Sequence, residues 1–300
     1  MIQPHSLLPT SFTPNKILAT KGTTLNHVST RGQVQAHFKK CTKESGLCKC
    51  NRRHFIEAFG TSLLPISNAS NAVELLNIDP MNMLDRVHPP RPDWYEEFYA
   101  SAMDKTMKSY EAEIAGYKSQ LFSNLRGNVL EIGIGTGPNL KYYANGSDIR
   151  IVGIDPNRKM KKYALAAAKA AGITSENFKF EQAVAEALPV DDASLDVVIG
   201  TLVLCSVEDV DLVLQEIKRV LKPGGTYLFI EHVAAQDGTI LKYVQGVLDP
   251  LQQFVADGCH LSRETGTSIL NAGFSTVNVH NIFLSSASLI NPHVYGIANQ

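Results

Sequence analysis

The segment from Asn128 to Asn139 constrains this 300-residue chain more than any other, because it joins an apolar run to three alternating glycines. The run suits a parallel strand covered on both faces, with Val129, Leu130 and Ile132. The glycines permit positive φ and let a ligand lie against bare backbone; they are Gly133, Gly135 and Gly137. Pro138 fits the first turn of a following helix and stands where a dinucleotide fingerprint needs a third glycine. The pattern predicts a ligand-binding strand, turn and helix, and it argues against NAD or FAD.

Two acidic residues complete the pattern. Glu131 ends the first apolar strand, and Asp155 ends a second strand at residues 151–155. Together with the glycine turn, they resemble the class I methyltransferases that use S-adenosylmethionine. The resemblance implies that the turn packs against the amino-acid end of this cofactor and that Asp155 accepts hydrogen bonds from both ribose hydroxyls. A carboxylate offers the paired acceptors that this requires. Such a residue is expected to be poorly buried by the protein alone.

The same resemblance assigns further cofactor contacts. Residues 184–189 resemble the loop that frames adenine, and residues 201–205 follow a fourth strand at the sheet edge where ligands collect. Many relatives carry an acid at the position of Val184, so here either backbone or Glu186 must bind the adenine amino group. The predicted cofactor-binding residues are Glu131, Gly133, Ile134, Gly135, Gly137, Asp155, Pro156, Ala185, Glu186, Thr201 and Leu202.

Hydrophobic periodicity predicts the surrounding elements. Apolar residues at steps of three and four between Met103 and Leu121 predict one long amphipathic helix. Asn157 and Ser262 are predicted to cap later helices. Two closing strands, residues 277–283 and 294–298, fit an antiparallel hairpin. Together with these elements, the resemblance to class I methyltransferases implies an α/β fold: a Rossmann-like seven-stranded class I methyltransferase sheet with helices on both faces and an antiparallel C-terminal hairpin edge.

The first part of the chain has a different composition. No Asp or Glu precedes Glu44, and this predicts a plastid transit peptide. Arg52 and Arg53, followed by an apolar run and a Ser-x-Ala end, resemble a twin-arginine signal for the thylakoid lumen; release into the stroma is the alternative. The predicted organisation is a targeting leader at 1–72, a proline-rich linker at 73–93 and a methyltransferase domain at 94–300. The expected location is the chloroplast, in the stroma or lumen.

Charge and cysteine usage limit the partners. The formal net charge of -1 gives no basic field, so nucleic acid is not an expected partner. No apolar run is long enough for a transmembrane helix, and the oligomeric state is not predicted. No disulfide framework or metal site is expected, although a metal cluster of leader residues stays open as an alternative: Cys41, Cys48, Cys50 and His54. Cys205 and Cys259 are expected to be buried packing residues.

A closer resemblance covers residues 94–300. The segments that carry it look like the methyltransferase-like 7 proteins, which methylate small thiols: residues 118–125, 201–207, 231–235, 257–259 with 263–264, and 292–296. The leader lies outside it, because the animal relatives begin with a hydrophobic membrane anchor. The resemblance implies a plant plastid enzyme that methylates a small lipophilic acceptor, with a thiol as the first expectation. Quinone-pathway C-methyltransferases are the alternative, followed by other small-molecule O-methyltransferases, a non-catalytic cofactor-binding protein and a nicotinamide-dependent oxidoreductase.

His232 is the candidate catalytic residue. The sulfonium of the cofactor carries an activated methyl group, so placement of the acceptor can supply most of the rate. A thiol with an ordinary pKa near 8.5 needs modest help to ionise, and His232 follows the fifth strand at the ligand-binding edge. The alternative is a histidine that only hydrogen-bonds the backbone.

Overall fold

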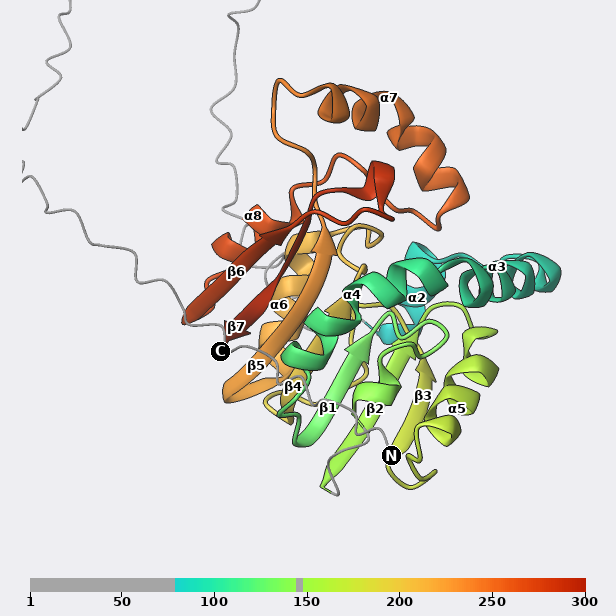
Figure 1. Cartoon of the computed structure of the whole chain (residues 1–300). Helices are drawn as coiled ribbons and strands as arrows, with labels where there is room; N and C mark the ends of the chain where they lie inside the picture. Colours follow the sequence, from blue (N-terminus) through green and yellow to red (C-terminus); the bar gives the residue numbers. More distant parts are fainter. Residues whose placement is uncertain (1–78, 144–147) are drawn as a thin grey trace, which may run out of the picture. The chain divides into compact units, whose positions relative to one another are not determined.

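The computed structural model describes residues 79–143 and 148–300, which contain a seven-stranded sheet with helices on both faces (Figure 1). The leader and its cysteine cluster lie outside the described residues. The strand order is β3-β2-β1-β4-β5-β7-β6. Strands β1 to β5 pair in parallel, whereas β7 runs antiparallel to both β5 and β6. The strands are β1 Gly127–Ile132, β2 Ile149–Asp155, β3 Phe178–Gln182, β4 Leu195–Thr201, β5 Leu221–His232, β6 Thr276–Ile282 and β7 His293–Asn299. The predicted fold class is confirmed.

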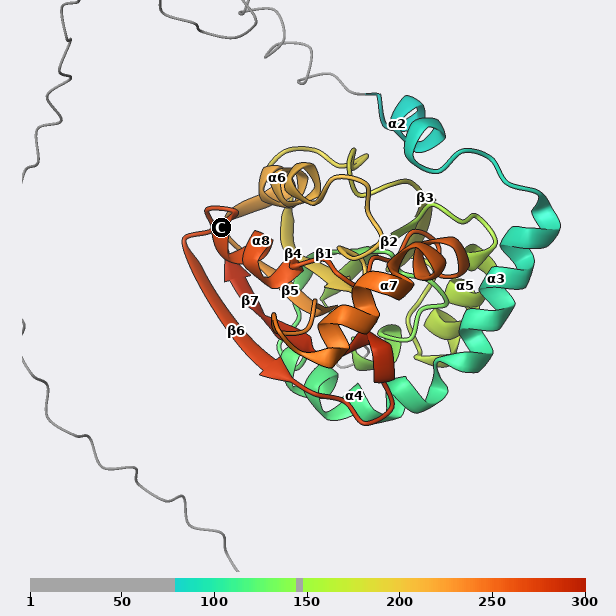
Figure 2. The same ribbon diagram turned by 90° about the horizontal axis from the view of Figure 1, so that it is seen from above.

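Helices cover the two faces of the sheet separately. Figures 1 and 2 show α4 and α5 against one face, α6 and α8 against the other, and α7 beyond the carboxyl ends of the strands. The helices are α2 Pro80–Val87, α3 Asp93–Thr106, α4 Lys108–Leu121, α5 Met160–Ala170, α6 Val210–Val220, α7 Ile240–Val255 and α8 Thr265–Asn271, with 3₁₀ turns η1 Leu140–Tyr142 and η2 Ser288–Ile290. In the described part of the chain, none of these helices combines the length and apolarity that crossing a membrane requires.

Alternation along β1 divides the core into two layers. Val129 packs in the same cluster as Ala164 of α5, whereas Leu130 packs in the cluster that contains Val213 of α6. Successive side chains of a strand point to opposite faces, so a continuous apolar run serves both layers. This burial on both faces fixes where β1 ends and therefore where the glycine turn emerges.

The predicted long helix is wrong, because the chain changes direction at Met107. This residue has φ -79° and ψ 0°, and it both ends α3 and begins α4. Helix α3 is held to α5 by the ion pair of Glu97 with Lys162, whereas Ile114 of α4 packs with Leu284 near the C-terminal hairpin. Helices α3 and α4 each have an apolar face that packs against a different part of the domain. The apolar period continues through Met107, so it does not reveal the bend.

The predicted linker contains helix α2, so that prediction is wrong for Pro80–Val87. The Asp79 side chain accepts a hydrogen bond from Met81 N at 3.2 Å, and Pro80 occupies the first helical turn, where its missing N–H costs nothing. Met83 and Leu84 are buried against the loop after β3. Residues 80–87 therefore belong to the folded domain.

Three helix starts also differ from prediction. The helix expected after the glycine turn is the single 3₁₀ turn η1. Asn157 does not cap α5; its Oδ1 instead accepts from Lys159 N at 2.8 Å in a turn that precedes Met160. Glu264, and not Ser262, stands directly before α8. Side-chain oxygens of these residue types satisfy turns as readily as helix ends, which explains the shifts.

Candidate active site

A cavity of ≈ 590 Å³ opens at the carboxyl ends of β1, β2 and β4. Open α/β sheets bind ligands at this edge, and the volume lies within the range of about 300 to 1,000 Å³ that is usual for ligand pockets. All of the predicted cofactor-binding residues line this one cavity: Glu131, Gly133, Ile134, Gly135, Gly137, Asp155, Pro156, Ala185, Glu186, Thr201 and Leu202. The structure brings them together, and their individual contacts with cofactor stay predictions.

The three glycines of the turn have positive φ but serve different purposes. A Cβ at Gly133 would lie 2.6 Å from Val203 Cγ2, and one at Gly137 would lie 2.8 Å from Leu140 Cδ1. Both positions are therefore closed by packing. At Gly135 the nearest atom would be Gly133 O at 4.0 Å, so this glycine leaves open space at the cavity. Bare backbone at this point suits close approach of a ligand.

Asp155 is buried by the protein itself, so the prediction of a poorly buried carboxylate is wrong. Its relative exposure is 7%. One oxygen accepts from Gly135 N and the other from Asn157 N, each at 2.9 Å. Burial raises the pKa of Asp155 to about 7, although both backbone donors act in the opposite direction. Since each carboxylate oxygen can accept more than one bond, Asp155 holds the glycine turn and keeps capacity for two ribose hydroxyls.

Glu131 and Asn139 form a buried polar network at the other end of the turn. The Glu131 oxygens accept from Asn139 Nδ2 and from the Tyr143 hydroxyl, both at 2.8 Å. Burial raises the pKa of Glu131 to about 7, against these bonds. Asn139 Nδ2 also donates to Thr201 Oγ1 at 3.1 Å, which leaves Asn139 Oδ1 without a partner among the described residues. This oxygen belongs to a cavity-lining residue and suits an ammonium donor.

These features fit S-adenosylmethionine. The molecule offers an ammonium group and two ribose hydroxyls as donors, while the cavity wall offers an unpartnered amide oxygen at Asn139 and spare acceptor capacity at Asp155. Glu186 is less available, because one of its oxygens accepts from Glu208 N at 2.8 Å, and burial raises its pKa. The adenine contact predicted for Glu186 must share the carboxylate with this bond.

The sequence did not reveal an ionic contact that borders the cavity. Arg91, just before α3, pairs with Asp257 in the loop after α7, and His88 Nε2 lies 3.7 Å from the same carboxylate. Burial raises the pKa of Asp257, but the nearby His88 imidazole and the charge of Arg91 outweigh it, so the pKa lies below its ordinary value. All three residues line the cavity. Arg91 was missed because the surrounding prolines suggested a linker.

Glu231 was also missed as a site residue. Its fully buried carboxylate accepts from Val203 N with both oxygens at 3.1 Å and from Leu204 N at 3.2 Å. Burial raises its pKa to about 7, against these backbone donors. The loop that it holds begins at Leu202, whose φ of 55° is uncommon for a residue with a side chain. Glu231 therefore positions the loop that follows β4 at the cavity wall.

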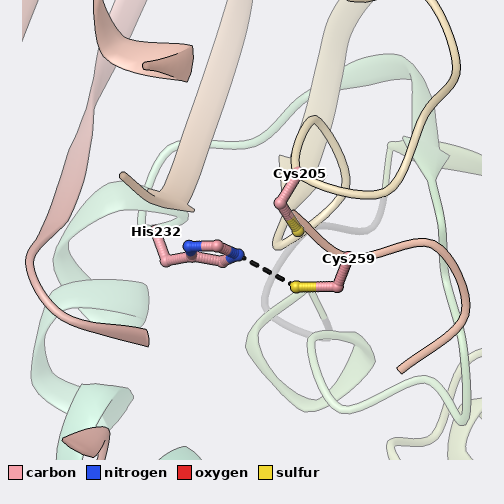
Figure 3. Close-up of side chains that lie close together, drawn as sticks. All are labelled: Cys205, His232 and Cys259. Atoms are coloured by element: carbon pink, nitrogen blue, oxygen red, sulfur yellow. Dashed lines mark hydrogen bonds between the residues drawn. The ribbon is translucent and has the colours of Figure 1, made fainter. Parts of the chain in front are cut away.

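His232 lies behind the cavity wall and not on it. Its relative exposure is 1%, and its Nε2 lies 3.1 Å from Cys259 Sγ (Figure 3). The neighbouring Cys205 thiol, followed by the contact with His232, lowers the pKa of Cys259, whereas the neighbouring Cys259 and burial raise the pKa of Cys205. Both cysteines are buried, as expected, but they face each other and the imidazole. Direct contact of His232 with the acceptor, as the predicted base requires, is not supported by this position.

Comparison with known proteins agrees with this site. A methyltransferase-domain family model matches residues 130–229. The thiol S-methyltransferase TMT1A of Homo sapiens is 39% identical over 202 residues, which are 63% of this chain and 80% of the relative. The thiol S-methyltransferase TMT1B of Rattus norvegicus is 39% identical over 183 residues, 58% of this chain and 73% of the relative.

A solved structure supports the fold independently. A chain of the complex between the Haloferax volcanii Trm112 methyltransferase activator and a putative methyltransferase has a TM-score of 0.55 and 18% identity, covering 70% of this chain and 100% of that one. The sequence relatives and the cavity together establish S-adenosylmethionine as the cofactor. The chain belongs to the family of the thiol S-methyltransferases TMT1A and TMT1B and is a class I S-adenosylmethionine-dependent methyltransferase.

Proposed function

We propose that this enzyme methylates the sulfur of a small lipophilic thiol. The observation that carries the proposal is the 39% identity to TMT1A across 80% of that thiol S-methyltransferase. The cavity adds support, because apolar side chains from α3, from the bend between α3 and α4 and from the loop after β4 line it beside the cofactor residues: Met103, Met107, Leu202, Val203 and Val207. Walls of this kind favour a lipophilic acceptor.

The protein's part in this reaction is mainly positioning. S-adenosylmethionine supplies an activated methyl group on a sulfonium. Asp155 would hold the ribose, and the glycine turn would hold the methionine end, both being fixed to the sheet by backbone hydrogen bonds. Arg91 and Asp257 pair with each other at the border of the cavity. In-line placement in a shielded site can supply much of the rate of a methyl transfer.

Paired acceptors test the proposal. Release of S-adenosylhomocysteine is measured with small aromatic and aliphatic thiols and with the matched phenols, alcohols and quinols. We expect thiols to be methylated faster than their hydroxyl counterparts, with rates that rise with pH towards about 8 to 9 as the thiolate fraction grows. Faster turnover of quinols or phenols would move the assignment to C- or O-methylation. Cofactor binding without turnover of any acceptor would indicate a non-catalytic protein.

We also propose that the enzyme acts in the chloroplast. The lack of acidic residues before Glu44 supports this location. N-terminal sequencing of protein from its native tissue should find the first forty or so residues removed, a length that rests on composition. Recovery of Met1 at the amino terminus would contradict import. Replacing Arg52 and Arg53 with lysine then separates the lumen from the stroma, because a twin-arginine signal loses function and a stromal protein is unaffected.

A further inference from the structure

Three side chains from distant segments converge behind the acceptor end of the cavity. Cys205 follows β4, His232 ends β5 and Cys259 follows α7, and all three are buried. One nitrogen and two sulfurs, the potential ligand atoms, lie within 4.8 Å of one another. Figure 3 shows the two sulfurs and His232 Nε2 pointing towards a common centre. A metal ion requires ligand atoms that point to one centre in this way. Two cysteines that only fill space in the core need not point to a common centre with a histidine nitrogen.

The spacing suits a tetrahedral ion. Bonds of about 2.3 Å to sulfur and about 2.0 to 2.1 Å to nitrogen place two sulfur ligands about 3.8 Å apart and a sulfur and a nitrogen about 3.6 Å apart. His232 Nε2 and Cys259 Sγ are 3.1 Å apart, so entry of an ion requires them to separate by about half an ångström. Side-chain rotation is sufficient for a change of this size.

Backbone contacts hold the cysteine loops in this arrangement. His260 N donates to Cys205 O at 2.9 Å, which ties the two loops directly. Arg263 Nη1 donates to Leu204 O at 2.8 Å and to Val207 O at 2.7 Å, on either side of Cys205. A Cβ at Gly258 would lie 3.1 Å from Ser206 O, and its φ of 82° also favours glycine. Fixed loops of this kind are typical of a site whose ligands must be positioned before an ion arrives.

We propose that Cys205, His232 and Cys259 bind a zinc ion whose fourth ligand is the sulfur of the acceptor thiol. Two thiolates and an imidazole are ligands that zinc prefers, and three protein ligands leave one position open, as in catalytic zinc sites. The identity of the fourth ligand rests on the proposed function. It is supported by the chain neighbours of the two cysteines, since Ser206, Val207 and Gly258 line the cavity. Each of the two cysteines therefore stands next in the chain to a residue of the cavity wall.

The proposed site explains how a thiol is ionised without a base in contact with it. When the acceptor sulfur enters the fourth position, a sulfur–zinc bond forms, the S–H bond breaks and the proton passes to water. The sulfur keeps the electron pair and remains anionic beside the cofactor cavity. Zinc lowers the pKa of a bound water from its bulk value to about 7, and it deprotonates a bound thiol outright. His232 then acts as a ligand and not as a general base.

Metal content tests the site independently of methyl transfer. The full-length protein carries serine at 41, 48 and 50 (C41S, C48S and C50S), so that leader cysteines do not contribute metal. It is purified, dialysed against a weak chelator and measured by mass spectrometry of the element. We expect about one zinc ion per chain, and almost none after Cys205→Ser, Cys259→Ser or His232→Ala. His293→Gln is the matched control, because His293 is a buried histidine with its ring centroid 6.3 Å from that of His232 and lies outside the cluster. It should retain the ion.

Cobalt substitution tests the fourth ligand and does not depend on variants that fold. In protein with the wild-type cluster we expect thiolate-to-cobalt charge transfer and intense visible bands. Added thiol, without S-adenosylmethionine, should change those bands, and the matched alcohol should not. An unchanged zinc content in Cys205→Ser and Cys259→Ser, or a Cys205–Cys259 disulfide in the metal-free protein as isolated, would overturn the site. A bound metal whose spectrum ignores thiol would overturn the ligand assignment.

The two proposals fail differently. Undiminished thiol methylation by protein without metal would reject the acceptor sulfur as a zinc ligand and leave the proposed function intact. A bound ion in an enzyme that methylates only hydroxyl or carbon acceptors would reject the thiol function and leave the metal site intact.

Discussion

The two ends of the cavity are built in different ways. At the donor end, the glycine turn and Asp155 come from two consecutive strand–turn units, β1 and β2, that are adjacent in the sheet. Behind the proposed acceptor end lie Cys205, His232 and Cys259, none of which lines the cavity, and they come from segments that are far apart in the chain. The donor end is therefore formed by residues that are close in sequence, whereas the residues at the proposed acceptor end are brought together only by the fold.

Both ends contain a carboxylate at the end of one strand that accepts hydrogen bonds from the loop after the neighbouring strand. Asp155 ends β2 and accepts from a turn after the neighbouring strand β1; Glu231 lies at the end of β5 and accepts from the loop after the neighbouring strand β4. Both are buried, and both have a raised pKa. They differ in exposure to ligand, because Asp155 lines the cavity and Glu231 does not. Asp155 can therefore both bind the ligand and hold the glycine turn, whereas Glu231 can only hold the loop after β4.

Asp155→Ala should have the largest effect. Loss of a charge-assisted pair of hydrogen bonds is expected to cost on the order of 2 to 3 kcal/mol, which weakens S-adenosylmethionine binding by about 30- to 150-fold. Because Gly135 N also loses its acceptor, the melting temperature should fall as well. Calorimetric titration measures the affinity. Asp196→Asn is the control, since Asp196 accepts from Asn128 N at the opposite end of β1, and it should leave the affinity unchanged.

Glu231→Gln should separate the two ends. The oxygen of the glutamine amide can still accept a hydrogen bond from Val203 N or Leu204 N, but the second carboxylate oxygen that holds the loop is lost. A displacement of the acceptor wall by a fraction of an ångström should lower kcat by about 10-fold, with the affinity for S-adenosylmethionine nearly unchanged. Steady-state kinetics and the same titration check both values. An equal loss of donor affinity would show that the ends are not independent.

The raised pKa of Glu131 predicts that the stability of the protein depends on pH. Its folded pKa of about 7 exceeds the ordinary value of 4.5, so between these pH values the folded protein holds a proton that the unfolded chain has released. This contribution is fully present below pH 4.5, and the free energy of unfolding falls as pH rises to about 7, by up to about 1.4 kcal/mol per pH unit. Urea unfolding of the cofactor-free protein measures it.

Comparison with Glu131→Gln isolates this group, because the amide does not titrate. The difference in the free energy of unfolding between the wild type and the variant should decrease from pH 5 to 7 and then stay constant. Cys259, whose lowered pKa acts in the opposite direction, is common to both proteins and cancels. A constant difference across this range would mean that Glu131 is ionised throughout, held so by Asn139 and Tyr143.

The ion pair at the cavity border should have the smallest effect. Arg91 and Asp257 are partly exposed, and such pairs contribute about 0.2 to 1 kcal/mol. Arg91→Met should raise the acceptor KM by about 2- to 5-fold with little change in donor affinity. A double-mutant cycle with Asp257→Asn measures the coupling. Additive effects of the two changes would show that the residues act separately.

The same contrast explains what could be predicted from the sequence. The strands and the donor residues could be predicted from apolar runs, glycines and strand-end acids that stand close together in the chain, whereas the architecture of the sheet was implied by the family resemblance. The bend at Met107 was not visible, because the apolar period continues through it. Helix α2 was hidden by Pro80, which starts a helix as readily as it interrupts one.

The burial of Cys205 and Cys259 was predicted correctly, but their proximity to each other and to His232 was not, for a related reason. Metal ligands are recognised in sequence by short spacing, and 54 positions separate these cysteines, with His232 between them. Only the fold brings them within reach of one another. Glu231 was overlooked because its partners are backbone N–H groups, which no sequence pattern displays.

The atom that receives the methyl group tests the central claim most directly. The full-length enzyme is incubated with S-adenosylmethionine that carries a trideuteriomethyl group and with an aromatic compound that bears both a thiol and a hydroxyl, and the product is analysed by mass spectrometry and nuclear magnetic resonance. We predict the label on sulfur, with product almost absent for Asp155→Ala at limiting donor. Label on oxygen or on a ring carbon would contradict thiol methylation.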